Sequence, residues 1–244
     1  MDRNSIFPAA WPLRHFEVNE LLGLVSEYPP RVLELSKDFL GGDVSLKDLA
    51  RLLEAVRGGN SIELVLAGTT DLVRCAGFPW ERYRRYVAVQ MAQARFLDCT
   101  GFRLMVGPRS SDVESGMVID RVGTLCEDLS PVQTCVEIHG GVESELSVLA
   151  ELLQSTPIMI VIDLENLDRA GLTAEELRAV MPPERVAYFH VRNLPGVWTE
   201  HPSTLRAQDE WQRDYPDAVF LWEPKSINAP ERIREAFIEY RKAH

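Results

Sequence analysis

Four ionisable side chains in the second half of the sequence each stand near the carboxyl end of an apolar run. They are Glu137, Asp163, His190 and Glu223. Spacings of 26, 27 and 33 residues separate them, each about the length of one strand-plus-helix unit. Carboxylate oxygens and an imidazole nitrogen are ligands for divalent cations. The pattern therefore predicts a site for one divalent metal ion, with Mn, Mg or Co as the main candidates and Zn as a further one.

The apolar runs that carry these residues are typical of buried strands. They are Thr134–His139, Ile158–Glu165, Val186–Arg192 and Val219–Lys225. In a strand, residues two positions apart share a face, so the side chains two residues after the four candidate ligands are expected one layer further out. These side chains are His139, Glu165, Arg192 and Lys225. A packed barrel layer carries branched apolar residues at such positions, so the polar residues predict a functional face.

The outer layer of polar residues is predicted to bind substrate. Arg192 and Lys225 carry charges that suit a carboxylate or phosphate group. The alternative is that they pair with Glu165 and with Glu34, which stands near the end of the earlier predicted strand Arg31–Leu35. Glu34 itself is a further candidate substrate contact.

Two more residues are candidates for the substrate pocket. His139 follows Glu137 on the same predicted face, so it is expected either to contact substrate or carry a proton, or to hydrogen-bond a ligand residue. Trp11 is a candidate pocket wall, because sugar-like ligands stack on aromatic faces.

Strand-like and helix-like segments alternate along the whole sequence. Eight such units in about 250 residues predict a single (β/α)8 TIM barrel of the α/β class, formed by residues 1–244 as one domain. An open, doubly wound sheet is the alternative, but no G-x-G-x-x-G motif follows an early strand. In a barrel the carboxyl ends of the strands form one ring, so the four candidate ligands should converge. The earlier strands are predicted at Ser5–Leu13 with its loop, Arg31–Leu35, Ile62–Ala67 and Phe102–Val106.

A structural role is the alternative interpretation of each candidate ligand. A lone glutamate or aspartate at a strand end often caps a loop or pairs with a cation. Four ionisable residues in equivalent positions favour a metal site instead. Without a cation, three inward carboxylates would repel one another, and at least one would tend to remain protonated.

Composition limits the function classes. The formal net charge of −11 over 244 residues disfavours a nucleic-acid partner, because phosphate backbones are bound by clustered Lys and Arg. No run approaches the ~20 apolar residues of a membrane span. The four cysteines have no C-x-x-C spacing and no secretory leader precedes them, so reduced thiols and a cytoplasmic location are expected. A small-molecule substrate is the expected partner, and the sequence leaves a homodimer open.

The four strand ends VEIH, VIDLEN, FHVRN and WEPK resemble those of the xylose-isomerase-like TIM-barrel superfamily. The resemblance covers residues 130–226, and the first half of the chain matches only in architecture. It implies that Glu137, Asp163, His190 and Glu223 hold one metal ion. It also implies that Glu137 and Glu223 remove and return a proton beside the carbonyl of a sugar-like substrate. The metal ion would stabilise the enediolate formed in that reaction.

Two departures from the family pattern leave the reaction subtype open. Asn166 stands where many epimerases of the family have histidine, and Asn193 stands where aspartate is frequent. We expect a metal-dependent isomerase or epimerase of a small hydroxy-carbonyl compound. A lyase or dehydratase on the same barrel and a non-catalytic metabolite-binding barrel remain as alternatives. A DNA-repair nuclease of the same superfamily is disfavoured, because it needs further histidine and carboxylate ligands.

Overall fold

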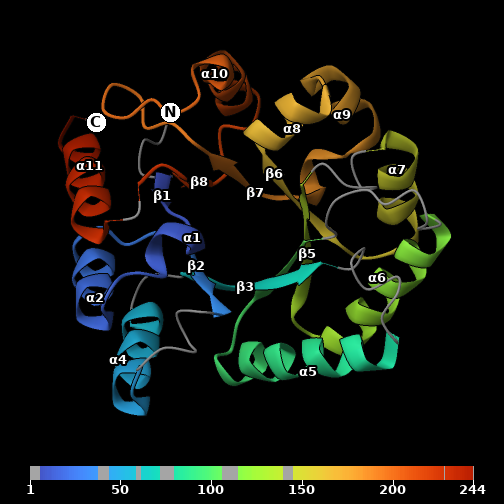
Figure 1. The fold of residues 1–244 in the computed structure, drawn as a ribbon, viewed down its shortest axis with the longest axis horizontal. Helices are drawn as coiled ribbons and strands as arrows, with labels where there is room; N and C mark the ends of the chain where they lie inside the picture. Colours follow the sequence, from blue (N-terminus) through green and yellow to red (C-terminus); the bar gives the residue numbers. More distant parts are fainter. Residues whose placement is uncertain are drawn as a thin grey trace. The chain divides into compact units, whose positions relative to one another are not determined.

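The strands of the computed structural model form one eight-stranded sheet with helices between successive strands (Figure 1). The structure describes residues 6–37, 44–58, 62–71, 80–105, 115–139, 145–227 and 229–243. The strand order is β1-β8-β7-β6-β5-β4-β3-β2, and neighbouring strands such as β4 and β5 run parallel. This is the topology of a (β/α)8 TIM barrel, so the predicted fold class is confirmed.

Two compact units make up the chain, and the first consists of Met1–Ala67 and His190–His244. In its core, the buried Phe237 makes edge contacts with Phe7 and Tyr28, with ring centroids 5.3 and 5.6 Å apart. Strands β3 and β7 each have residues in both units. The strands and helices of the first unit are β1 (Ile6–Pro8), α1 (Ala10–Leu13), α2 (Val18–Glu27), β2 (Val32–Ser36), α4 (Leu46–Arg57), β3 (Glu63–Asp71), β7 (Val186–Val191), α10 (Leu205–Asp214), β8 (Phe220–Trp222) and α11 (Pro230–Ala243).

The second unit consists of Gly68–Phe189. Its strands are apolar runs such as Met159–Asp163, as expected for parallel strands that are covered on both faces. Arg84 and Asp128 join helices α5 and α6 through two hydrogen bonds of 2.6 and 2.7 Å. The elements of this unit are α5 (Trp80–Phe96), β4 (Gly101–Met105), α6 (Ser115–Leu129), β5 (Gln133–Ile138), α7 (Leu146–Ser155), β6 (Met159–Asp163), α8 (Leu164–Ala170), α9 (Ala174–Val180) and the 3-10 helix η3 (Pro183–Arg185), and a second 3-10 helix, η4 (Pro202–Thr204), belongs to the first unit.

Several strands end earlier than the sequence pattern predicts. β6 ends at Asp163 and helix α8 begins at Leu164, so Glu165 lies in a helix and not in the strand. β8 ends at Trp222, which places Lys225 in the following bend. The predicted first strand also contains helix α1 after Pro8. Ser5, at the start of that first predicted strand, and Val106, at the end of the predicted strand Phe102–Val106, lie outside the described residues.

The cysteines that the structure describes are buried, and no disulfide joins them to one another. They are Cys99, Cys126 and Cys135, while Cys75 lies outside the described residues. Burial raises the pKa of Cys99 to about 12, so its thiol remains protonated near neutral pH.

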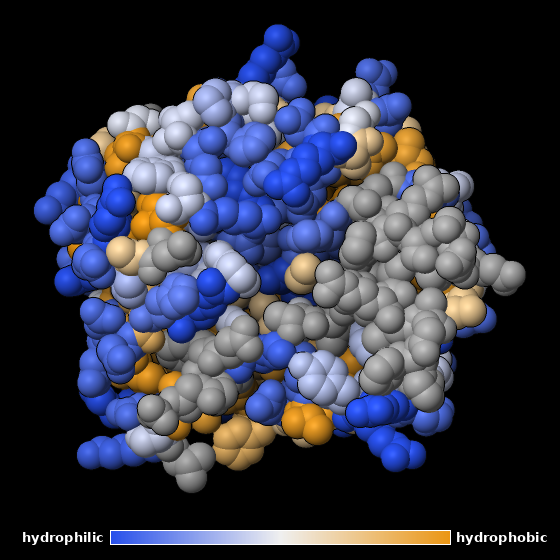
Figure 2. Space-filling model, in the orientation of Figure 1, coloured by the Kyte–Doolittle hydropathy of each residue, from blue (hydrophilic) through white to orange (hydrophobic). Residues whose placement is uncertain are grey.

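Hydrophilic side chains predominate on much of the face drawn in Figure 2. Within the described ranges, none of the helices has both the length and the apolar character that crossing a membrane requires.

Truncating Phe237 should destabilise the first unit. Phe237→Ala removes a fully buried ring with two aromatic neighbours, and we expect a loss of about 3–5 kcal/mol in the free energy of unfolding. Phe237→Leu keeps most of the buried volume and should lose less. Urea titrations followed by circular dichroism would measure both, and equal stability of Phe237→Ala and wild type would contradict this packing.

Candidate metal centre

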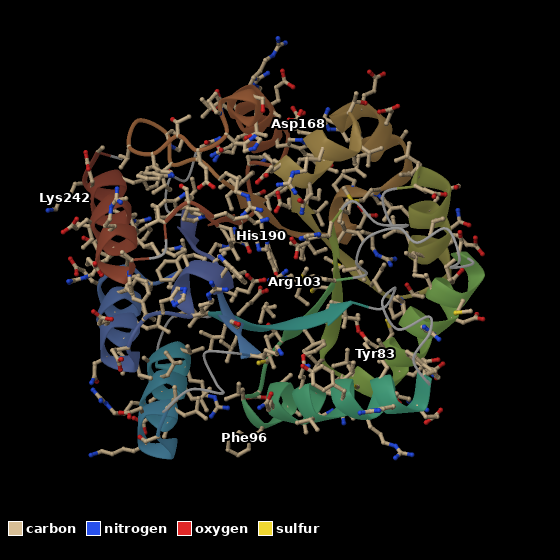
Figure 3. All side chains as sticks on the ribbon, in the orientation of Figure 1. Tyr83, Phe96, Arg103, Asp168, His190 and Lys242 are labelled. Carbon is tan, nitrogen blue, oxygen red and sulfur yellow. The ribbon has the colours of Figure 1, made fainter. Side chains whose placement is uncertain are left out.

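The four predicted ligands stand at the carboxyl ends of successive strands, as the sequence pattern predicts. Glu137 and His190 are the penultimate residues of β5 and β7, Asp163 is the last residue of β6, and Glu223 directly follows β8. All four side chains are buried. In Figure 3, His190 lies among the strands, whereas Phe96, Asp168 and Lys242 lie on helices at the outside.

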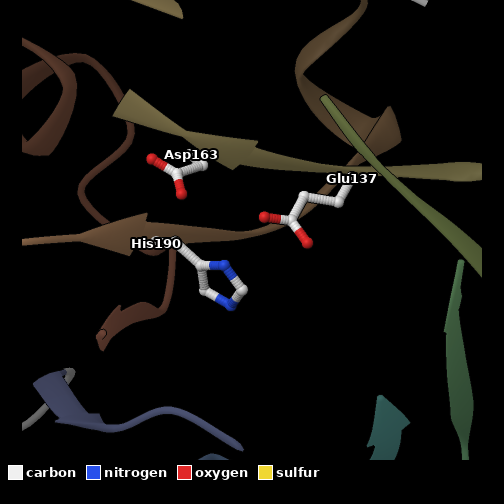
Figure 4. Close-up of side chains that lie close together, drawn as sticks. All are labelled: Glu137, Asp163 and His190. Atoms are coloured by element: carbon white, nitrogen blue, oxygen red, sulfur yellow. The ribbon is translucent and has the colours of Figure 1, made fainter. Parts of the chain in front are cut away.

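Three of these four residues form a cluster that is able to hold a metal ion. One ligand atom each from Glu137, Asp163 and His190 lies within 4.8 Å of the other two (Figure 4). Two carboxylate oxygens and one imidazole nitrogen are a donor set that Mn, Co, Zn and, less readily, Mg accept. The chemistry and spacing of the donors therefore fit one divalent cation.

Glu137 is held by an arginine of the neighbouring strand. Arg103 on β4 donates from its Nη1 atom to Oε2 of Glu137, and both side chains are buried. In the register of the two strands Arg103 lies opposite Cys135, two residues before Glu137, so the two charged side chains are diagonal neighbours on one face. The sequence interpretation missed Arg103. The sequence feature that could have identified it is that Arg103 is the only charged residue in the apolar run Phe102–Val106.

Asp163 has a structural role in addition to its place in the cluster. Its Oδ1 atom accepts hydrogen bonds from the backbone N–H groups of Glu165 (2.9 Å) and Asn166 (3.2 Å), and this caps helix α8. The cap explains why the helix begins immediately after β6. Glu165 is consequently displaced from the strand face where alternation placed it, and its buried carboxylate pairs with Arg169 one helical turn later.

Glu223 is outside the three-residue cluster and contacts Arg192. The Arg192 Nη1 atom donates both to Oε2 and to the backbone oxygen of Glu223. The backbone of the same two segments is also joined, because the N–H of Glu223 donates to Val191 at 2.9 Å and the Trp222 indole donates to the Arg192 carbonyl at 3.3 Å. Arg192 is therefore fixed against the end of β8 and has Glu223 as its carboxylate partner.

His190 has a carboxylate beside it. The Nε2 atom of His190 lies 3.3 Å from Oε2 of Glu34, and both side chains are fully buried. The same carboxylate oxygen accepts a hydrogen bond of 3.1 Å from the backbone N–H of Ala10. Glu34, predicted as a substrate contact or as a partner of Arg192 or Lys225, thus stands next to the imidazole.

The other predicted substrate contacts have different surroundings. His139 is half-buried directly after β5. Lys225 is exposed, and its backbone N–H donates to the carboxylate of Glu200. Trp11 in α1 is also exposed, with the guanidinium of Arg14 3.1 Å from its ring centroid.

The two asparagines that depart from the family pattern both bind backbone. Asn166 donates to the carbonyl of Ile138 at 3.3 Å. Asn193 accepts from the backbone N–H groups of Glu200 and His201 and donates to the His201 carbonyl, all at 2.9–3.0 Å. Asn193 therefore orders the loop that follows β7.

Each buried carboxylate that the structure describes has a donor or a cation beside it. Glu137, Glu165 and Glu223 contact the guanidiniums of Arg103, Arg169 and Arg192. Asp163 and Glu34 accept from backbone N–H groups. Buried charges are costly unless they are paired or coordinate a metal, so these contacts stabilise the ionised side chains.

Comparison with solved structures identifies the fold. A xylose isomerase domain-containing protein from Salmonella typhimurium is 12% identical over 100% of this chain and 98% of its own, with a TM-score of 0.76. The probable 3-DHS dehydratase AsbF from Bacillus anthracis is 13% identical over 95% and 96%, with a TM-score of 0.72. The 3-keto-D-glucoside 4-epimerase YcjR from E. coli is 14% identical over 98% and 99%, with a TM-score of 0.67. No protein-family model and no curated protein matches the sequence.

A further structural neighbour has a bound metal. The IolI protein, solved with a zinc atom, is 16% identical over 97% of this chain and 95% of its own, with a TM-score of 0.65. These neighbours include xylose isomerase-like domains, a probable dehydratase, sugar epimerases and IolI, and this chain shares their fold, that of the xylose-isomerase-like TIM barrels. The resemblance inferred from four strand ends is confirmed at the level of the fold.

The two roles of Asp163 can be separated by substitution. Asp163→Asn keeps an oxygen that is able to cap helix α8, so the ion-free protein should keep its stability. Asp163→Ala removes the cap and should lower the free energy of unfolding by about 0.5–2 kcal/mol. Urea titration of the chelator-treated proteins measures this. If both variants lost the same amount, the cap would not explain the start of the helix.

Proposed function

We propose that this protein is a metal-dependent isomerase or epimerase of a small, sugar-like hydroxy-carbonyl compound. The observation that carries the proposal is the buried cluster of Glu137, Asp163 and His190 at the carboxyl ends of β5, β6 and β7. In TIM-barrel enzymes the active site lies at that end of the strands. The sugar epimerases among the structural neighbours agree with this class of reaction.

The cluster would hold the divalent ion, and Glu223 is proposed as its fourth ligand. Binding at Glu223 requires its carboxylate to share its charge between the ion and Arg192. The ion, when bound, supplies Lewis-acid polarisation of the substrate carbonyl. A site of carboxylates and one imidazole suits Mn or Co, with Mg and Zn as alternatives, and zinc is the ion bound in the IolI neighbour.

Glu137 and Glu223 are the proposed proton carriers. One glutamate, as a carboxylate, removes the proton from the carbon beside the carbonyl, and the other, as a carboxylic acid, returns a proton to the product. The glutamate that acts as the base must be ionised, and each of the two has a guanidinium beside it, from Arg103 or from Arg192, that stabilises a negative charge. Burial of both glutamates excludes bulk water from the proton transfer.

The proposed partners follow from this chemistry. The ligand is a small molecule, and neither nucleic acid nor a membrane is involved. His139 and Arg192 are retained as substrate contacts, because His139 follows Glu137 by two residues in the chain and Arg192 contacts Glu223. A cytoplasmic location is part of the same proposal.

A dehydratase is the second candidate. It is favoured by the likeness to the probable 3-DHS dehydratase AsbF and by Asn166 and Asn193, which replace residues frequent in the epimerases. Both reactions begin with removal of a proton beside a carbonyl. They differ in whether water then leaves, so detection of an unsaturated product separates them.

Proton exchange tests the proposed roles directly. Mn²⁺-loaded protein is incubated in D₂O with D-fructose, D-tagatose and other ketoses, and deuterium uptake beside the carbonyl is followed by NMR. Glu137→Gln and Glu223→Gln should each slow the exchange by about 10²-fold or more. Chelation by EDTA should also abolish it.

Glu176→Gln is the matched control. Glu176 caps helix α9 together with Thr173, so the same charge is removed outside the cluster and exchange should be unaffected. Near-UV circular dichroism of each variant verifies folding, because Glu137→Gln leaves Arg103 without that carboxylate. Exchange at the wild-type rate in both folded glutamate variants would refute the assigned roles.

A further inference from the structure

We propose that Glu34 is a positioning residue that orients His190 and thereby makes Nδ1 the metal-ligating atom. The inference deepens the proposed function, because it assumes that His190 binds the ion. The sequence suggested Glu34 as a substrate contact, whereas in this proposal it acts on the ion by orienting the imidazole of His190.

The geometry places the carboxylate at one nitrogen of the ring. Oε2 of Glu34 lies 3.3 Å from Nε2 of His190, and neither side chain is exposed to solvent. An ionised carboxylate only accepts hydrogen bonds, so this contact is favourable when Nε2 carries the proton. In a neutral imidazole with a proton on Nε2, the lone pair lies on Nδ1.

A metal ion binds the nitrogen that holds the lone pair. Metal-binding histidines generally donate their other N–H to a carboxylate, a carbonyl or water, and this contact fixes the tautomer and raises the basicity of the ligand. Oε2 of Glu34, at 3.3 Å from Nε2, is near enough to accept this N–H. The carboxylate on Nε2 therefore assigns Nδ1 of His190 to the ion.

The carboxylate is itself fixed by the start of α1. Its Oε2 atom also accepts from the N–H of Ala10 at 3.1 Å, and the neighbouring Ala9 donates to the carbonyl of Trp222 at 2.8 Å. Glu34 is a central residue of β2, paired in register with Val65 of β3. Its backbone and its carboxylate are thus both anchored before any ion binds.

The test measures the tautomer and the metal affinity of the folded protein. Protein labelled with ¹⁵N-histidine is examined by long-range ¹H–¹⁵N NMR, without ion and with Zn²⁺, and the His190 signals are assigned by their loss in His190→Gln. The wild type should show a protonated Nε2 in both states and a Zn²⁺-bound Nδ1. Calorimetric titration should show Zn²⁺ binding weakened about 10–100-fold in Glu34→Gln.

Glu176→Gln again serves as the control for loss of one negative charge, and its Zn²⁺ affinity should equal that of wild type. Zn²⁺ bound at Nε2 in the wild type, or unchanged affinity in a folded Glu34→Gln variant, would overturn the inference while leaving the metal site intact. If the wild type bound no Zn²⁺ or Mn²⁺ at all, the proposed function would fail together with this inference.

Discussion

Burial of several carboxylates at the ends of the central strands is the constraint on which this structure depends. A buried carboxylate is costly unless a cation or hydrogen-bond donors compensate its charge. The chain compensates them individually: Arg103 contacts Glu137, Arg192 contacts Glu223, and the first N–H groups of helix α8 contact Asp163. Glu34 stands against His190. Three ligand atoms within 4.8 Å of one another, from Glu137, Asp163 and His190, then form a cluster that is able to hold a divalent cation.

These contacts connect stability with the proposed chemistry. The carboxylate of Asp163 caps the first residues of helix α8 and is also one of the three members of the cluster. The arginines that neutralise Glu137 and Glu223 also compete with an ion for their oxygens, because each guanidinium occupies one of them. Metal affinity in this protein should therefore depend on Arg103 and Arg192 as well as on the ligands.

Much of the fold and the principal candidates could be read from the sequence. Each strand-end residue follows an apolar run, and the spacing of the runs matches a strand-helix repeat, so local patterns were sufficient to place Glu137, Asp163 and His190 at strand ends. The residues at which the strands end could not be predicted from the alternation of side chains. Alternation predicts that Glu165 continues the face of Asp163, but the capping hydrogen bonds of Asp163 turn the chain into a helix at Leu164. Lys225 likewise falls beyond the short strand β8.

Contacts between distant residues could not be predicted from local patterns. The approach of Arg103 to Glu137 depends on the register of two strands, and the approach of Glu34 to His190 joins β2 to β7 across more than half of the chain. The sequence pattern singled out Glu34, Glu137 and His190 without identifying these partners, and it missed Arg103.

Metal content is the most direct test of the central claim. Tag-free protein purified after Mn²⁺ supplementation would be analysed by inductively coupled plasma mass spectrometry beside a folded Glu137→Gln/Asp163→Asn double variant. A metal centre built on Glu137, Asp163 and His190 predicts about one divalent ion per wild-type chain and none in the variant. Wild-type protein that remains without an ion even in excess metal would contradict it, and the buried carboxylates would then be compensated by the chain alone.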